Sequence, residues 1–515
     1  MKKIVKYGGY VLIAGLFAWL AANLFFEEEY AQFLDTFSRE DKVEVHGDLV
    51  IAEPVPMRGF EPTIFETFTR QRLNNVYETL VRPDRDLNMK PSLALSWGML
   101  DDVRWEFNLR PDVLFHDGSE LDAGDVRDSI FRARNYEGSE LKDLLSTVED
   151  VSLVDDLTLV VETHRPDPLL LQKLATVYVL PSWVIEKYGD EDVLEPIGTS
   201  TYKVVKLDTS GVLEMDGFAR YWGDAPIYKN VTIVTILNTE GRVRAVQDGT
   251  VDVLDYVPHD FASELGDGYE VRSIPSLEVQ FLIFNPNRSL FGNVGTRKAI
   301  SKVFDREGFA SYLGEFVRPS YQFVSNGVFG FDPDIVAGKV RDDVSGMGIE
   351  GRRIVVYLPV GLENLGEYIE NSLEGVGMRS VVKYFDGEEY LEAIESGKAD
   401  MYFMGYRSEL GDASDFLVSV VHTSAEVDGK VYGQYNFVGE VNASLDLAVE
   451  SQQYELDEEK RLFKLQNIMK TVVESDVIGV PLFEYETVFA VKDGLDFEPR
   501  IDGFIYINDI KPNED

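Results

Sequence analysis

Residues 96–134 read SWGMLDDVRWEFNLRPDVLFHDGSELDAGDVRDSIFRAR, and this stretch decides the fold. Apolar and polar residues alternate over residues 105–109, and this period of two predicts a strand with one buried face. The dipeptide Asp117-Gly118 predicts a turn. Asp122 stands where a helix N-cap belongs, and Asp125 follows three residues later, where its charge suits the start of a helix. The stretch therefore predicts a strand, a turn and a capped helix in that order.

The same stretch carries the residues of a known family signature. It resembles the family 5 extracytoplasmic solute-binding proteins, the dipeptide- and oligopeptide-binding receptors of ABC importers. In that family a strand ending in Leu-Arg leads into a Phe-His-Asp-Gly turn and an Ala-x-Asp-Val helix start, which are here Leu109-Arg110, Phe115–Gly118 and Ala123–Val126. Further family-like stretches follow in the expected order, at residues 75–81, 91–97, 197–202, 221–223, 294–300 and 480–485. The resemblance covers nearly all of the chain from Asp48 onward.

A repeated order of strands and helices predicts the fold class. Residues 230–256 read as a strand, a helix and a second strand, and residues 353–406 read as alternating strands and helices. Such alternation implies parallel sheets, so two sets far apart in the sequence predict two α/β lobes. The resemblance implies a two-lobed periplasmic-binding-protein-like fold of type II, with hinge strands, a ligand closed between the lobes, and a subdomain inserted at about residues 82–180.

The predicted organisation has five parts. An apolar N-terminal segment and an acidic linker precede the folded region, and the second lobe interrupts the first. The predicted parts are an anchor at 1–26, a linker at 27–47, the first lobe at 48–265, the second lobe at 266–481 and a return to the first lobe at 482–515.

The N-terminal segment predicts a membrane anchor. Three lysines precede an apolar run over residues 7–26, which is interrupted only by Asn23. A run of about 20 apolar residues can span a bilayer, and lysines before it keep that end in the cytoplasm. A cleaved signal peptide is the alternative, although its apolar core is usually only about 7–15 residues long. We therefore expect an uncleaved anchor and a protein on the extracytoplasmic face of the membrane, the alternative being a secreted or periplasmic protein.

The composition limits partners and chemistry. The formal net charge of −42 makes nucleic acid a poor partner, because its phosphates are repelled. Cysteine is absent, which removes disulfides and thiolate metal sites, and also the lipid-modified cysteine that tethers many receptors of the resembled family. The five histidines have no metal spacing, and we expect His116 to be a turn residue. The G-x-G-x-x-G run at 346–351 precedes a predicted strand, so it reads as a loop. We expect no cofactor, no metal and no enzyme activity.

The resemblance implies the ligand and the partners. Short peptides are the implied substrate class, and ABC permease subunits with their ATPases are the implied partners of a receptor that we expect to be monomeric. Another solute, such as an oligosaccharide or a nickel chelate, is the alternative within the family. An anchored chaperone or interaction scaffold with the same fold is the alternative outside transport.

The resemblance also implies a ligand-binding site. In peptide receptors of this family, a Gly-Trp pair ends a second-lobe strand, and an aspartate three residues after the Trp binds the peptide's α-ammonium. Here the predicted strand 401–404 ends at Gly405-Tyr406, and Glu409 takes the aspartate position. Arg407 lies close in sequence and could neutralise Glu409 instead, or the segment could be an ordinary solvated loop. The candidate ligand-binding residues are Phe403, Tyr406, Arg407, Glu409, Asp412 and Tyr485.

Overall fold

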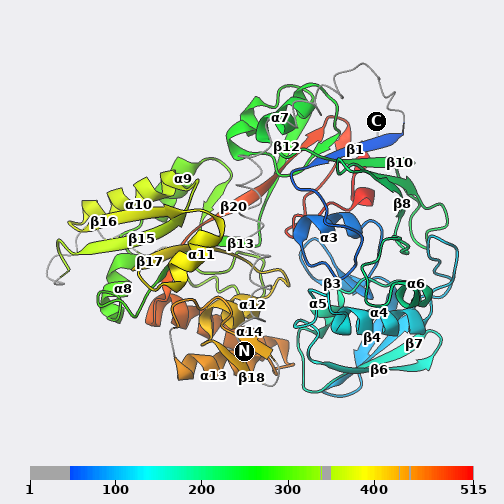
Figure 1. Ribbon diagram of the computed structural model, residues 1–515, viewed down its shortest axis with the longest axis horizontal. Helices are drawn as coiled ribbons and strands as arrows, with labels where there is room; N and C mark the ends of the chain where they lie inside the picture. The colour runs from blue at the N-terminus through cyan, green and yellow to red at the C-terminus, as the bar shows by residue number, and fades with distance from the viewer. Residues whose placement is uncertain (1–46, 337, 339–348, 428–429, 440–441, 514–515) are drawn as a thin grey trace. The chain divides into compact units, whose positions relative to one another are not determined.

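The computed structural model describes residues 47–513, apart from short internal gaps (Figure 1). These gaps are residue 337 and residues 339–348, 428–429 and 440–441. The predicted anchor, and the predicted linker up to residue 46, lie outside the described residues. Among the described helices, none is both long and apolar enough to cross a membrane.

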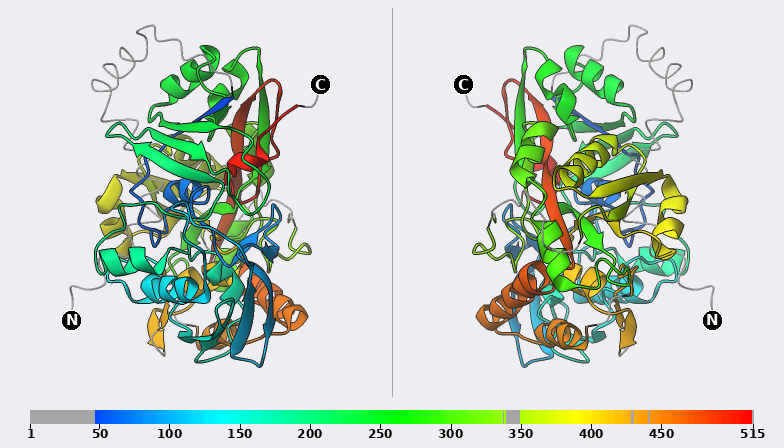
Figure 2. Two further views of the ribbon diagram at one scale, coloured as in Figure 1. Left: turned by 90° about the vertical axis from the view of Figure 1, so that its right-hand side faces the viewer. Right: turned by 90° about the vertical axis from the view of Figure 1, so that its left-hand side faces the viewer.

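The described chain divides into two compact units. The first unit holds the residues up to Ile274 and those from Thr487 onward, and the second unit holds Pro275–Glu486. The chain passes between the units inside two strands, β12 (Tyr269–Pro275) and β20 (Gly479–Lys492), and Figure 2 shows β20, in orange-red, as one long strand. The lobe ends predicted at 265 and 481 stay predictions, since no turn signal marks a boundary that lies inside a strand.

A mixed sheet forms the core of the first unit. β1 (Asp48–Glu53) lies between β10 (Asn230–Thr235) and β11 (Val253–Leu254) and is parallel to both. β9 (Leu213–Gly217) and β8 (Tyr202–Leu207) extend the sheet in antiparallel pairs beyond β10. The predicted strand, helix and strand at 230–256 are thus present, with a shorter second strand. The accompanying elements are α3 (Thr67–Leu73), α6 (Ser182–Tyr188), α7 (Thr239–Gln247), β21 (Leu495–Asp496) and β22 (Lys511–Pro512).

A smaller antiparallel sheet with its own core lies within the first unit. Its strands run in the order β4 (Ala94–Met99), β5 (Arg104–Leu109), β7 (Thr158–Thr163) and β6 (Val148–Asp155). The buried cluster around it extends from Leu80 to Val179. The inserted subdomain at about residues 82–180 stays a prediction. The other elements of this region are β2 (Val81–Pro83), β3 (Met89–Pro91), α4 (Ala123–Asn135) and α5 (Leu170–Leu174).

The local predictions for residues 96–134 are confirmed. The Asp122 side chain accepts hydrogen bonds from the backbone N–H groups at 124 and 125, and the Asp125 side chain accepts one from the Asp122 N–H, which makes a full capping box for α4. His116 is the predicted turn residue: its Nε2 donates to the carbonyl oxygen of Ser200 at 2.9 Å, and its Nδ1 accepts from the N–H of Gly198 at 3.3 Å. Burial lowers the pKa of His116 to about 4, which keeps the ring neutral and Nδ1 able to accept.

The second unit is built on a mixed sheet, in which β14 (Val317–Pro319) also pairs with β20. Its strands run in the order β16 (Arg379–Phe385), β15 (Arg353–Pro359), β17 (Met401–Arg407), β13 (Glu278–Phe284) and β20. β15 is parallel to both neighbours, as the predicted alternation at 353–406 requires, whereas β13 is antiparallel to β17 and β20. The helices of this unit are α8 (Val294–Ser301), α9 (Arg306–Leu313), α10 (Glu363–Gly375), α11 (Gly387–Glu395), α12 (Ser414–Phe416), α13 (Ala443–Gln452) and α14 (Glu458–Lys470) (Figure 1). The short strands are β14 (Val317–Pro319), β18 (Ala425–Val427) and β19 (Lys430–Tyr432).

Candidate ligand-binding site

The candidate site lies in the second unit, where the end of β17 meets the start of β13. The antiparallel register places Glu278 opposite Arg407 and Gln280 opposite Gly405. Because side chains alternate across a strand, Glu278 and Gln280 project from the same face of β13. The backbone N–H of Ser408 donates to the carbonyl oxygen of Leu277 at 3.0 Å, so the segment after β17 stays beside β13 as far as this residue.

Arg407 and Glu409 form an ion pair. The distance from Nε of Arg407 to Oε1 of Glu409 is 3.2 Å, and only 10% and 12% of the two side chains are exposed. The neutralising role that the sequence left open for Arg407 is therefore realised in this structure. Glu409 is nevertheless no ordinary solvated loop residue, since its carboxylate is largely removed from solvent. A ligand cation at Glu409 would have to share this carboxylate with Arg407.

Glu278 and Gln280 were missed by the sequence analysis. The Nε2 of Gln280 donates to Oε1 of Glu278 at 2.6 Å. Oε1 of Gln280 is buried and has no hydrogen-bond partner among residues 47–513 outside the gaps named above. Burial raises the pKa of Glu278 and the charge of Glu409 raises it further, although the Gln280 hydrogen bond and the charge of Arg407 oppose the shift. The signal that could have found the pair is two polar residues on one face of an otherwise apolar strand, LEVQFLIF at 277–284.

Gly405 leaves room for these two side chains. A Cβ at this position would lie 2.6 Å from Oε1 of Gln280 and 2.7 Å from Oε1 of Glu278. A larger residue would shift the ends of both side chains, so the absence of a side chain at Gly405 accommodates this close approach. The two acceptor oxygens consequently lie side by side against bare backbone, next to the Arg407–Glu409 pair.

Phe403 and Tyr406 belong to the apolar core of the second unit. They are 3% and 7% exposed, and the Tyr406 ring packs edge-on against Phe416 at a centroid distance of 5.6 Å. Burial raises the pKa of Tyr406 well above its usual range. Both residues support the position of β17, and the Phe403 carbonyl also accepts from the Tyr390 hydroxyl at 2.7 Å.

The contacts given for Asp412 and Tyr485 are not with the Arg407–Glu409 pair. Arg461 holds the Asp412 carboxylate in a buried bidentate pair, with Nη1–Oδ2 and Nη2–Oδ1 distances of 2.6 and 2.8 Å. This pair joins α14 to the segment after β17, so Asp412 has a structural role, and we leave it out of the proposed ligand contacts. Tyr485 lies on β20 opposite Val317 of β14, and it is 37% exposed. The structure therefore brings together Arg407 and Glu409, with Glu278 and Gln280 as additional members of the same cluster.

The comparisons with known proteins agree with this architecture. The family model for bacterial extracellular solute-binding proteins, family 5 (middle part), matches residues 88–427. The chain belongs to this family. It is thus an extracytoplasmic solute-binding receptor of the class that serves ABC importers, and the predicted family and function are confirmed at this level. Membrane anchoring is a separate question, because the predicted anchor lies outside the described residues.

Curated relatives and solved structures are similar over most of the chain. The dipeptide-binding protein of Escherichia coli (strain K12) is 23% identical over 427 residues, which are 73% of this chain and 79% of that protein. The periplasmic binding protein DppA from Helicobacter pylori, solved with the peptide STSA, has a TM-score of 0.71 at 18% identity and covers 91% of this chain and 98% of its own. CtaP from Listeria monocytogenes has a TM-score of 0.80 at 20% identity, covering 91% and 99%. These likenesses confirm the two-lobed α/β fold.

Proposed function

We propose that this family 5 receptor captures short peptides by their α-amino group and delivers them to the permease of an ABC importer. The observation that carries the proposal is the position of Glu409, three residues after Tyr406, beside a second carboxylate at Glu278. Glu409 supplies this cluster with a largely buried carboxylate, and Glu278 supplies a second acidic side chain. An α-ammonium group, with three N–H donors and a positive charge, is chemically complementary to such a cluster.

The Arg407 ion pair is compatible with this role. A guanidinium that holds a carboxylate fixes its orientation, and a carboxylate can accept hydrogen bonds from more than one donor. Because Glu409 is largely buried, a charge-assisted bond formed there is stronger than one formed in water. Glu409 is one methylene longer than the family's aspartate, which lets it reach an ammonium while contacting Arg407.

The remaining parts of the proposal concern the cell. We propose that residues 7–26 stay attached as an anchor on the extracytoplasmic face, which would replace the lipid tether of related receptors. The receptor is proposed to act as a monomer that hands its ligand to permease subunits served by ATPases. A receptor for an uncharged solute, and a scaffold without a transport role, are the competing functions.

Calorimetry with matched peptides tests the ligand class. Free-amine tripeptides should bind the purified protein, and their N-acetylated forms should bind poorly. Glu409→Gln should weaken binding of the free-amine peptides by about 2–5 kcal/mol, the usual cost of removing one partner of a buried charge pair. Binding of the acetylated forms should change far less. Glu459→Gln is the matched control, because Glu459 is an exposed carboxylate on α14 of the same unit, and it should leave binding unchanged.

Two results would oppose the proposal. Equal affinities for acetylated and free peptides would favour an uncharged solute. Mass spectrometry of the molecule that co-purifies with the protein would identify such a solute, and a protein that binds no small solute would favour the scaffold.

A further inference from the structure

The cluster at the start of β13 holds a buried acceptor that no group among the described residues satisfies. Gln280 is 3% exposed, and its Nε2 donates to Glu278. Its Oε1 has no hydrogen-bond partner within the part of the chain that the structure describes. Buried polar atoms are nearly always paired, so an exception calls for a donor supplied from outside the chain. The carboxylate beside it makes this position attractive to a donor that also carries a positive charge.

The position is distinct from Glu409. Oε1 of Gln280 and Oε1 of Glu278 both lie against the bare backbone of Gly405, near the end of β17. Glu409 lies beyond the end of β17 and pairs with Arg407. An ammonium bound at Glu409 would therefore leave the oxygens at Gly405 available to a second group of the same ligand.

The chemistry of that second group follows from the acceptors present. A carboxylate or phosphate would be repelled by Glu278 and Glu409. A hydroxyl group or a water molecule would satisfy Oε1 of Gln280 but would not offset the carboxylate of Glu278. An ammonium or guanidinium does both, since it supplies several N–H donors and a positive charge.

We propose that Glu278 and Gln280 form a second cation subsite, which selects peptides that carry lysine or arginine near the amino terminus. The proposal rests on the peptide-receptor function argued above and names its preferred substrates. The strongly negative net charge of the chain, −42, is consistent with the attraction of cationic ligands.

Calorimetry on the full chain tests the subsite with two matched peptide pairs. Lys-Ala-Ala is compared with norleucyl-Ala-Ala, and Ala-Lys-Ala with Ala-norleucyl-Ala, since norleucine keeps the apolar stem and lacks the ammonium. At one position or the other, the lysyl peptide should bind at least tenfold more tightly than its norleucyl partner.

Variants assign the preference to these residues. Glu278→Gln, and separately Gln280→Leu, should bring the lysyl-to-norleucyl affinity ratio close to one. Glu459→Gln should leave the ratio at its wild-type value. The ratio is the readout, so a variant with altered overall affinity is still informative, and the second variant serves if the first does not fold.

The same peptides and variants distinguish a failure of the subsite, a failure of its assignment to Glu278 and Gln280, and a failure of the peptide-receptor function. If all four peptides bind and neither pair shows a preference, the subsite is overturned while the peptide-receptor function stands. If the preference exists but survives both variants, the assignment to Glu278 and Gln280 is overturned. If neither the lysyl nor the norleucyl peptides bind, the proposed peptide-receptor function is overturned, and the subsite proposal falls with it.

Discussion

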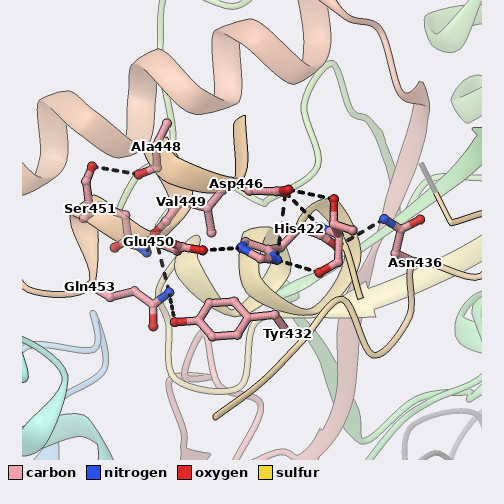
Figure 3. A network of polar contacts seen from close by, with 11 residues as sticks. His422, Tyr432, Asn436, Asp446, Ala448, Val449, Glu450, Ser451 and Gln453 are labelled. Carbon is pink, nitrogen blue, oxygen red and sulfur yellow. Dashed lines mark hydrogen bonds and ion pairs between the residues drawn. The ribbon is translucent and has the colours of Figure 1, made fainter. Parts of the chain in front are cut away.

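The imidazole of His422 lies 3.1 Å from the carboxylate of Glu450, measured from Nε2 to Oε1 (Figure 3). Its Nδ1 lies 2.6 Å from the carbonyl oxygen of Thr423, so both ring nitrogens face acceptors. The ring is 2% exposed and packs on Tyr432 of β19. His422 thereby ties α13 to the segment that contains β18 and β19, in the second unit.

Loss of this link should destabilise the second unit. His422→Phe keeps the ring and its packing but removes both contacts, and leaving buried acceptors unpaired should cost about 1–3 kcal/mol. Glu450→Gln should cost less, because the amide oxygen of glutamine can still accept from Nε2 of His422, and the side chain at 450 is about one-third exposed. Urea unfolding of both variants measures the difference. An unchanged unfolding free energy in His422→Phe would contradict the role assigned to the imidazole.

The buried pair of Arg461 and Asp412 should be a larger determinant of stability. Arg461→Met leaves the Asp412 carboxylate buried and uncompensated, which should cost about 3–5 kcal/mol. Lys460→Met is the matched control, since Lys460 precedes Arg461 on α14 and pairs with Asp457 at the surface. That exposed pair should contribute less than about 1 kcal/mol. Similar losses for the two variants, measured by denaturant unfolding, would refute the buried-pair argument.

Glu484 on β20 should make stability fall as pH rises. Its pKa is raised from 4.5 to about 7, mainly by burial and then by the charge of Glu486, while the charge of Arg318 lowers it. The folded state therefore holds a proton that the unfolded state releases above about pH 4.5. Ionising Glu484 costs stability progressively between about pH 4.5 and 7, and the cost is full above that window.

Glu484→Gln isolates this effect. At pH 8 the variant should be more stable than wild type by about 2–3 kcal/mol, and near pH 4 the two should be equally stable. Unfolding free energies between pH 4 and pH 8 supply the comparison, with Glu459→Gln as an exposed carboxylate control. A stability difference that does not vary with pH would rule out the assigned ionisation.

The N-terminus offers a test outside the described residues. If residues 7–26 remain attached, the native protein should fractionate with membranes and retain its own N-terminus. Cell fractionation followed by N-terminal sequencing checks both points. A mature chain that begins near Asn23 would show instead that the segment is a cleaved signal.

The sequence by itself determined the family and much of the local structure. The capping box of Asp122 and Asp125 and the alternating strand before it depend on residues close together in the chain, whose geometry follows from backbone periodicity. The alternation over 353–406 likewise determined a parallel arrangement, and the family motif placed Glu409 beside the end of β17. Such features can be read from sequence because neighbouring residues decide them.

Only the tertiary structure decided which charges meet. Asp412 reads as part of the same loop as Glu409, but Arg461, 49 residues later, holds its carboxylate. Glu278 and Gln280 are brought to Arg407 and Gly405 by the register of β13 on β17. Composition and spacing do not specify that register, because it is set by how apolar faces pack across the whole sheet. The charged groups around the site are therefore brought together by packing between distant segments. Once such a charge is buried, its partner is needed to offset the cost of removing it from water.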